Sequence, residues 1–150
     1  MNMNRNHVVV PQFVEFIPSN LQGGLLYISK KYGVVTHLCC CGCNNKVVTP
    51  IVAGQWQLSV QGEFVSLVPS IGNTNFPCRS HYFITRNQVE WCGAMTDRGA
   101  QRSRKLAEMR QQRYFKMKNS GESQHARPPE KATPPEKWSL WDFIKRFFGD

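Results

Sequence analysis

The stretch VVTHLCCCGCNNKVVTPI, residues 34–51, decides the fold of this chain. Its two ends, 34–40 and 46–51, are rich in β-branched residues and predict two short strands. Gly and Asn residues between them predict a turn. Four of the six cysteines fall within five residues at this turn, which is more than packing alone requires. The pattern therefore predicts a β structure organised around a cysteine cluster.

More short strands are predicted on both sides of this stretch. Alternating or β-branched apolar residues mark them, and the segment 69–77, rich in Pro and Gly, is predicted to be a loop. These strands cover residues 8–18, 23–28, 56–60, 64–68, 81–85 and 89–91. We therefore expect a mainly β fold: a small antiparallel β domain that spans 8–92 and is stapled by the cysteine cluster.

The remainder of the chain changes composition. Residues 97–118 are rich in Arg, Lys, Gln and Ala without a wide apolar face, and predict a basic, solvated helix. Residues 119–137 are Pro-rich and nearly free of apolar side chains, and predict a disordered linker. Residues 138–148 place aromatic and aliphatic side chains at helical spacing, and predict a short amphipathic helix that docks on a partner subunit or, alternatively, touches a membrane surface.

The formal charge of +9 on 150 residues is concentrated in one segment. Residues 96–118 hold eight basic and two acidic residues, whereas 119–150 hold five of each. Nucleic-acid binding is therefore a less favoured function, because a basic helix is more often a solvated surface. Residues 1–7 lack the pattern of a secretory signal and no apolar run is long enough to span a bilayer, so we expect a cytoplasmic protein.

The cysteine cluster predicts a metal site. On a strand that leads into a turn, Cys39, Cys41 and Cys43 point to one side and Cys40 to the other. Cys78 can supply a ligand from elsewhere in the fold, and Zn²⁺ accepts four Cys, or three Cys and one His, tetrahedrally. Whether Cys39 or His81 completes the set stays open. The alternative is a group of small buried cysteines in a β core.

Two adjacent polar residues, Ser80 and His81, follow Cys78 and are candidates for catalysis. Neighbouring residues in a strand point to opposite faces, so Ser80 and His81 are not expected to pair with each other. His37 and Glu15 are the candidate partners, with Glu15 as a general base or as an acceptor that orients a histidine. The alternatives are a solvent-facing Glu15 and a structural His37.

An ordered set of motifs resembles a known family. The motifs are VEFIP (14–18), GLLYIS (24–29), HLCCCGC (37–43), VVTP (47–50), PSIGN (69–73) and PCRSHY (77–82). Together they resemble the small Cys-rich family encoded in bacterial ubiquitin-like conjugation operons. The resemblance implies a zinc-binding β domain with Cys39, Cys41, Cys43 and Cys78 at the metal and Ser80 and His81 as a polar pair beside it. The sequence departs from the family pattern at Asn44, where Gly is usual, and at Thr74, where Trp is usual.

The resemblance further implies a peptidase that trims or removes a ubiquitin-like modifier, so the expected partners are a ubiquitin-like protein or its conjugates. If four thiolates close the metal site, the catalytic groups of such a peptidase would be side chains near the metal. If only three thiolates bind the metal, a water molecule activated by the metal would attack the substrate. The alternative is a non-catalytic, zinc-stapled module that binds a partner protein of the same pathway.

Overall fold

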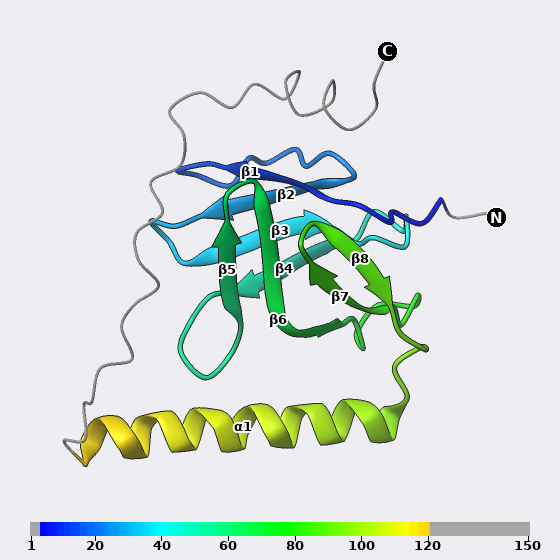
Figure 1. Cartoon of the computed structure of the whole chain (residues 1–150). Coiled ribbons are helices and arrows are strands. Elements are labelled where there is room, and N and C mark those ends of the chain that lie inside the picture. The colour runs from blue at the N-terminus through cyan, green and yellow to red at the C-terminus, as the bar shows by residue number, and fades with distance from the viewer. Residues whose placement is uncertain (1–3, 121–150) are drawn as a thin grey trace.

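Two four-stranded sheets and one long helix make up the fold, as described for residues 4–120 by a computed structural model (Figure 1). The first sheet has the order β1 (Val10–Phe13), β2 (Leu25–Ser29), β3 (Val34–Leu38), β4 (Lys46–Pro50). The second has the order β5 (Gln57–Gln61), β6 (Phe64–Gly72), β7 (His81–Thr85), β8 (Gln88–Trp91). The predicted mainly β class is confirmed.

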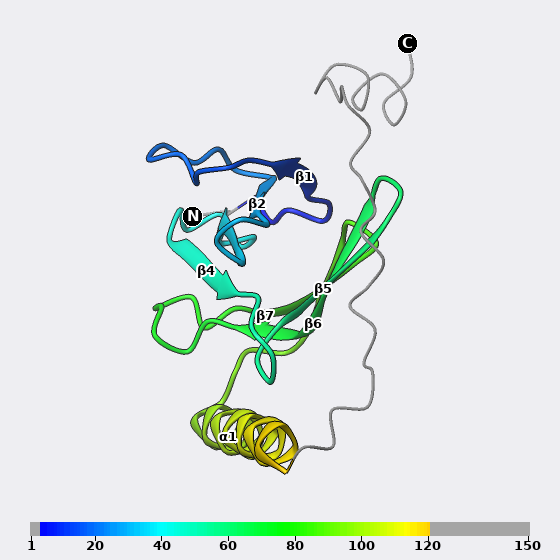
Figure 2. The same ribbon diagram turned by 90° about the vertical axis from the view of Figure 1, so that its left-hand side faces the viewer.

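A single apolar core lies between the two sheets, and Figure 2 shows α1 (Asp97–Asn119) beyond the second sheet. The alternation in β7 shows how the second sheet is built. Tyr82 and Ile84 are fully buried, whereas Phe83 and Thr85 are exposed. Because successive side chains of a strand point to opposite faces, β7 has an inner face toward the first sheet and an outer face away from it.

The first sheet is not wholly antiparallel, because β1 pairs with β2 in parallel. The chain first runs along the second sheet, where Val8 bridges Gln88 and the Val89 N–H donates to the His7 carbonyl at 2.8 Å. It then crosses to the first sheet as β1. The long connection from β1 to β2 returns the chain to its starting end, which is what a parallel pair requires.

Strand β6 is longer than the sequence predicts. A loop is expected over 69–77, but β6 continues through Gly72 and pairs Ile71 with Tyr82. The register shifts between Leu67 and Ile71. Four steps along β6 there match two steps along β7, so the strand bulges and then resumes pairing with its buried side chains still facing inward.

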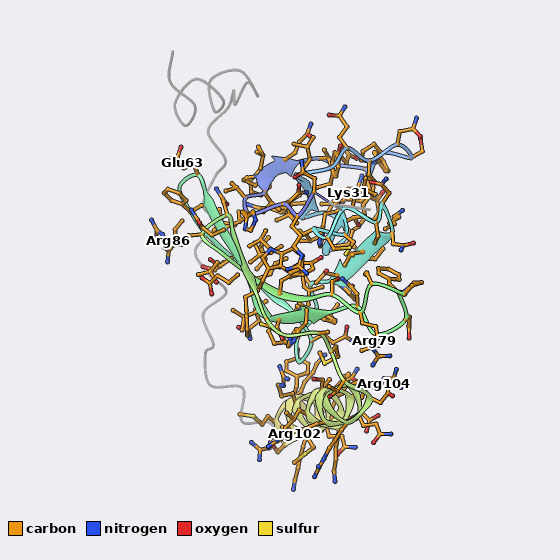
Figure 3. All side chains as sticks on the ribbon, turned by 90° about the vertical axis from the view of Figure 1, so that its right-hand side faces the viewer. Lys31, Glu63, Arg79, Arg86, Arg102 and Arg104 are labelled. Carbon is orange, nitrogen blue, oxygen red and sulfur yellow. The ribbon has the colours of Figure 1, made fainter. Side chains whose placement is uncertain are left out.

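Helix α1 occupies the predicted basic segment and is mostly solvated, since Ala100 is its buried residue among those described. Thr96 caps it by accepting the Gly99 N–H at 3.1 Å. Arg79 binds its start by donating to the Met95 carbonyl and to Asp97. Figure 3 shows Arg102 and Arg104 on this helix at the opposite end of the molecule from Lys31.

Within residues 4–120, no helix combines the length and the apolar character that a membrane span requires. The predicted helix 138–148 lies outside the described residues. So does the predicted linker 119–137, apart from Asn119, which ends α1, and Ser120.

Candidate functional site

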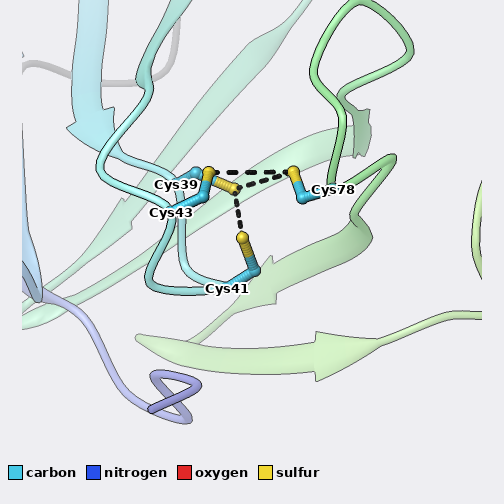
Figure 4. A group of neighbouring side chains, drawn as sticks. All are labelled: Cys39, Cys41, Cys43 and Cys78. Carbon is cyan, nitrogen blue, oxygen red and sulfur yellow. Dashed lines mark hydrogen bonds between the residues drawn. The ribbon is translucent and has the colours of Figure 1, made fainter. Parts of the chain in front are cut away.

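Four cysteines converge between the two sheets. Cys39, Cys41 and Cys43 lie where β3 turns toward β4, and Cys78 lies between β6 and β7 (Figure 4). Their four sulfur atoms all lie within 4.8 Å of one another. The turn that gathers them needs glycine at position 42, because φ there is +88° and a Cβ would lie 3.1 Å from the Asn4 carbonyl oxygen.

The spacing of these sulfur atoms fits a metal ion. The Sγ of Cys39 lies 3.4 Å from that of Cys41 and 3.9 Å from that of Cys78, and the Sγ of Cys43 lies 3.8 Å from that of Cys78. Metal–sulfur bonds of about 2.3 Å in a tetrahedron put the sulfurs about 3.8 Å apart. Cys39, Cys41, Cys43 and Cys78 could therefore hold a metal ion together.

The pKa values of the cysteine thiols are also relevant to metal binding. Burial raises the pKa of the Cys39 and Cys41 thiols, because their thiolates would lose hydration. At Cys43, burial also raises the pKa, but hydrogen bonds from Asn45 and neighbouring thiols outweigh it and bring the pKa to about 7. A bound cation would compensate the buried negative charge, so metal binding would release protons from this group.

The other two cysteines lie outside the group. Cys40 is fully buried and points away from the cluster toward Tyr82, as the predicted alternation requires. Burial raises the pKa of the Cys40 thiol to about 12, which keeps it neutral. Cys92 follows β8 and is partly exposed.

Ser80 lies on the inner face of the second sheet, against the cysteine cluster. Its side chain is 6% exposed, and its Oγ lies 3.0 Å from Cys39 Sγ. Asn73 donates to the Ser80 Oγ at 2.8 Å through its side chain and to the Ser80 carbonyl at 2.9 Å through its backbone. These contacts connect the ends of β6 and β7 to the turn that carries Cys39, Cys41 and Cys43.

His37 is buried between the sheets. Its Nε2 lies 2.8 Å from the Tyr82 hydroxyl, and its Nδ1 is without a hydrogen-bond partner among the described residues. Burial lowers the pKa of His37 to about 4, so its imidazole is neutral near pH 7. His37 therefore faces the inner side of Tyr82, the residue next to His81, and not His81 itself.

Glu15 lies at the surface. Its carboxylate forms an ion pair with Lys31, and both side chains are more than half exposed. The structure therefore pairs Glu15 with a lysine and not with one of the candidate histidines.

His81 pairs with a serine that the sequence did not single out. Its Nε2 lies 2.9 Å from the Oγ of Ser70 in β6. Gly72 is the residue opposite His81, and Ser70 is two residues before Gly72, so all three share the outer face of the second sheet. Ser70 and His81 are both partly exposed. A serine hydroxyl within hydrogen-bond distance of an imidazole is the arrangement of a nucleophile and its base.

The sequence contained one signal for this pair. In the motif PSIGN, Ser70 and Gly72 are two residues apart. In a strand, these two small residues would lie on the same face. The sequence instead predicts a loop there, because Pro69 and Gly72 are typical of turns. It gives no sign of the register shift between β6 and β7. The structure thus separates Ser80 and His81 onto opposite faces, as expected, and brings Ser70 rather than Glu15 or His37 to His81.

Comparison with known proteins identifies one family. Residues 13–92 match the model of a family described as "Bacterial ubiquitination-like system serine protease (BubE)". No curated protein and no solved structure matches the chain.

Proposed function

The chain belongs to the bacterial ubiquitination-like system serine protease (BubE) family, and on that premise we propose that it is a peptidase with Ser70 as nucleophile and His81 as general base. The observation that carries the proposal is the 2.9 Å separation between Ser70 Oγ and His81 Nε2. Both side chains are partly exposed on the outer face of the second sheet, so a substrate can reach them.

The reaction follows from this geometry. Ser70 Oγ attacks the carbonyl carbon of the scissile amide while His81 Nε2 takes the hydroxyl proton. The proton then passes from His81 to the leaving amine, the C–N bond breaks, and an ester on Ser70 remains. A water molecule attacks that ester, and His81 takes its proton and returns it to Ser70. The products are a free amine and a carboxylate.

In this proposal the metal held by the four cysteines is Zn²⁺ with a structural role. Four thiolates fill a tetrahedral zinc ion, which leaves no position for water or substrate. The ion would join the turn after β3 to the loop before β7 and so hold β7 in place. Cys39, Cys41, Cys43 and Cys78 would then stabilise the fold, while the outer face performs the cleavage.

Ser80 and Asn73 then act as positioning residues. They lie on the inner side of the strands that carry the dyad, within hydrogen-bond distance of Cys39. His37 stabilises Tyr82 through the buried hydrogen bond. The substrate would be a ubiquitin-like protein of the same system, either as a precursor with a C-terminal extension or as a conjugate, and the site of action the cytoplasm, where thiols stay reduced.

The test is cleavage of the system's ubiquitin-like protein carrying a short C-terminal extension. The full chain should cleave it, and Ser70→Ala and His81→Ala should each lower kcat/KM by at least about a hundredfold. Ser59→Ala is the matched control, because Ser59 is an exposed serine of β5 in the same sheet. Activity retained in Ser70→Ala but lost in Ser80→Ala would assign the nucleophile to Ser80. A tight complex without cleavage would support the binding module.

A further inference from the structure

In the second sheet, residues 69–72 of β6 have a neighbouring strand on one side only. β5 pairs with β6 from Gln61↔Phe64 to Gln57↔Val68, and β6 then continues for residues 69–72. β7 lies on one side of this segment. Within residues 4–120, no strand pairs with it on the β5 side. Pro69, which has no N–H, stands where the pairing with β5 stops, as is usual for proline at a sheet edge.

The backbone groups of Gly72 point toward this open side. The Asn73 N–H donates to the Ser80 carbonyl at 2.9 Å, so the backbone groups of Asn73 face β7. Because the direction alternates along a strand, those of Gly72 face the other way. His81, the residue opposite Gly72, is consistent with this direction. Its carbonyl accepts the Cys92 N–H at 2.9 Å and therefore faces β8, not Gly72.

The other edge of the sheet is already occupied. The N-terminal segment runs beside β8, with the Val89 N–H donating to His7 and Val8 bridging Gln88. The described part of the chain therefore protects the β8 edge and leaves the segment 69–72 with unsatisfied pairing capacity. An unprotected edge of this kind is a template for an extended peptide.

The open segment contains the proposed nucleophile. Ser70 is two residues before Gly72 on the same strand, and its Oγ meets His81 on the outer face. A peptide residue opposite Gly72 would place the following peptide bonds alongside Ser70 if the peptide ran antiparallel to β6, as β5 does. Gly72 has no side chain on the outer face because the side chain of Met95 lies there, where a Cβ would meet it.

We propose that the substrate binds as an added antiparallel strand along residues 69–72 of β6, with Gly72 exchanging two backbone hydrogen bonds with one substrate residue. This inference rests on the proposed function. The occupant is the extended, unfolded tail of the ubiquitin-like protein, because only a chain free of its own secondary structure has backbone groups available. Recognition at this segment would depend on the substrate backbone and not on particular side chains.

The first experiment changes the substrate backbone. Peptides that match the tail of the system's ubiquitin-like protein plus a short extension carry a single N-methyl group, moved one residue at a time, and are cleaved by the full wild-type chain. The peptide methylated at the residue opposite Gly72 should lose about tenfold in kcat/KM, because its N–H is removed. Peptides methylated at the two neighbouring residues, whose N–H groups point away from β6, should lose much less. Equal kcat/KM for all the methylated peptides and the unmodified peptide would overturn the inference.

The second experiment observes the protein. Full-length Ser70→Ala is mixed with the unmodified tail peptide, and amide hydrogen exchange is followed by NMR. Exchange of the Gly72 amide should slow at least about tenfold when peptide is bound, while the amide of Gly62, in the turn between β5 and β6, stays unchanged. Unchanged Gly72 exchange in a saturated complex would contradict strand addition.

A separate readout distinguishes the two proposals. A small fluorophosphonate can react with an activated serine without strand pairing. Labelling of Ser70 together with N-methyl insensitivity would refute strand addition alone. No labelling and no cleavage would refute the Ser70–His81 peptidase, and the inference with it.

Discussion

The Oγ of Ser80 lies 3.0 Å from the Sγ of Cys39, and this contact joins the cysteine turn to the strand that carries His81. Asn73 strengthens the connection, because its side chain donates to the same hydroxyl at 2.8 Å. The cysteine cluster thus packs against the inner side of the β6–β7 pair, and the Ser70–His81 pair lies on the outer face of these two strands. A disturbance at the cluster would reach the pair through Ser80 and Asn73.

We expect Ser80→Ala to weaken the protein without abolishing cleavage. The substitution leaves Asn73 without its closest side-chain acceptor, and the free energy of unfolding should fall by about 1–2 kcal/mol. Cleavage should fall less than tenfold and the metal content should stay the same. Steady-state kinetics, urea unfolding and metal analysis of one preparation check this. A complete loss of cleavage at unchanged stability would instead make Ser80 part of the chemistry.

Cys78→Ser should remove the metal and much of the stability. Cys78 is the member of the four-cysteine group that lies in the loop before β7, so its loss would leave only three thiolates for the proposed metal ion. Loss of even a third of the binding free energy of a structural zinc site lowers stability by roughly 3–5 kcal/mol. Elemental analysis should find one zinc per wild-type chain and much less in the variant. Cys92→Ser, outside the cluster, should retain both metal and stability.

Tyr82→Phe should destabilise the core. The substitution removes the hydroxyl that lies 2.8 Å from His37 Nε2, and His37 Nδ1 already has no partner in the described part of the chain. An imidazole buried without hydrogen bonds costs about 1–3 kcal/mol, which chemical denaturation would measure. Tyr32→Phe is the control, because Tyr32 is 54% exposed. Equal stability of the two variants would show that the buried bond contributes little.

Glu15→Gln should leave cleavage unchanged. Glu15 and Lys31 form an exposed ion pair, and such pairs contribute at most about 1 kcal/mol. Kinetics and thermal unfolding of the variant test this expectation. A loss of kcat at wild-type stability would show that Glu15 takes part in catalysis, as its place among the apolar residues of 14–18 suggested.

Gly54→Ala should loosen the attachment of α1. At Gly54 φ is +82°, and a Cβ would lie 3.0 Å from the Cα of Gln111 in the helix. Gly62 has φ of +60° but open space around it, so Gly62→Ala measures the backbone strain alone. We expect Gly62→Ala to lower the free energy of unfolding by about 1 kcal/mol, and Gly54→Ala to lower it further and to show faster amide exchange in α1. Equal exchange in the two variants would argue against this contact.

Local sequence patterns predicted the cysteine cluster and most of the strands, but not the second half of β6. Alternation of β-branched residues predicts strands close to the observed β3, β4, β7 and β8, because local burial periodicity reflects the two faces of a sheet. The same alternation separates Cys40 from Cys39 and Cys41. The parallel pairing of β1 with β2 was not predictable in this way, since it depends on the path of the chain between sheets.

The sequence by itself determined the mainly β class, the basic helix and the four cysteines that come together. It also determined that Ser80 and His81 lie on opposite faces, because the side-chain period of a strand is two. Only the tertiary structure decided which serine meets His81. That choice depends on the register between β6 and β7, where a bulge after Leu67 brings Gly72 opposite His81 and Ser70 beside it. Register is set by packing between distant segments, so no local pattern in residues 69–82 contains it.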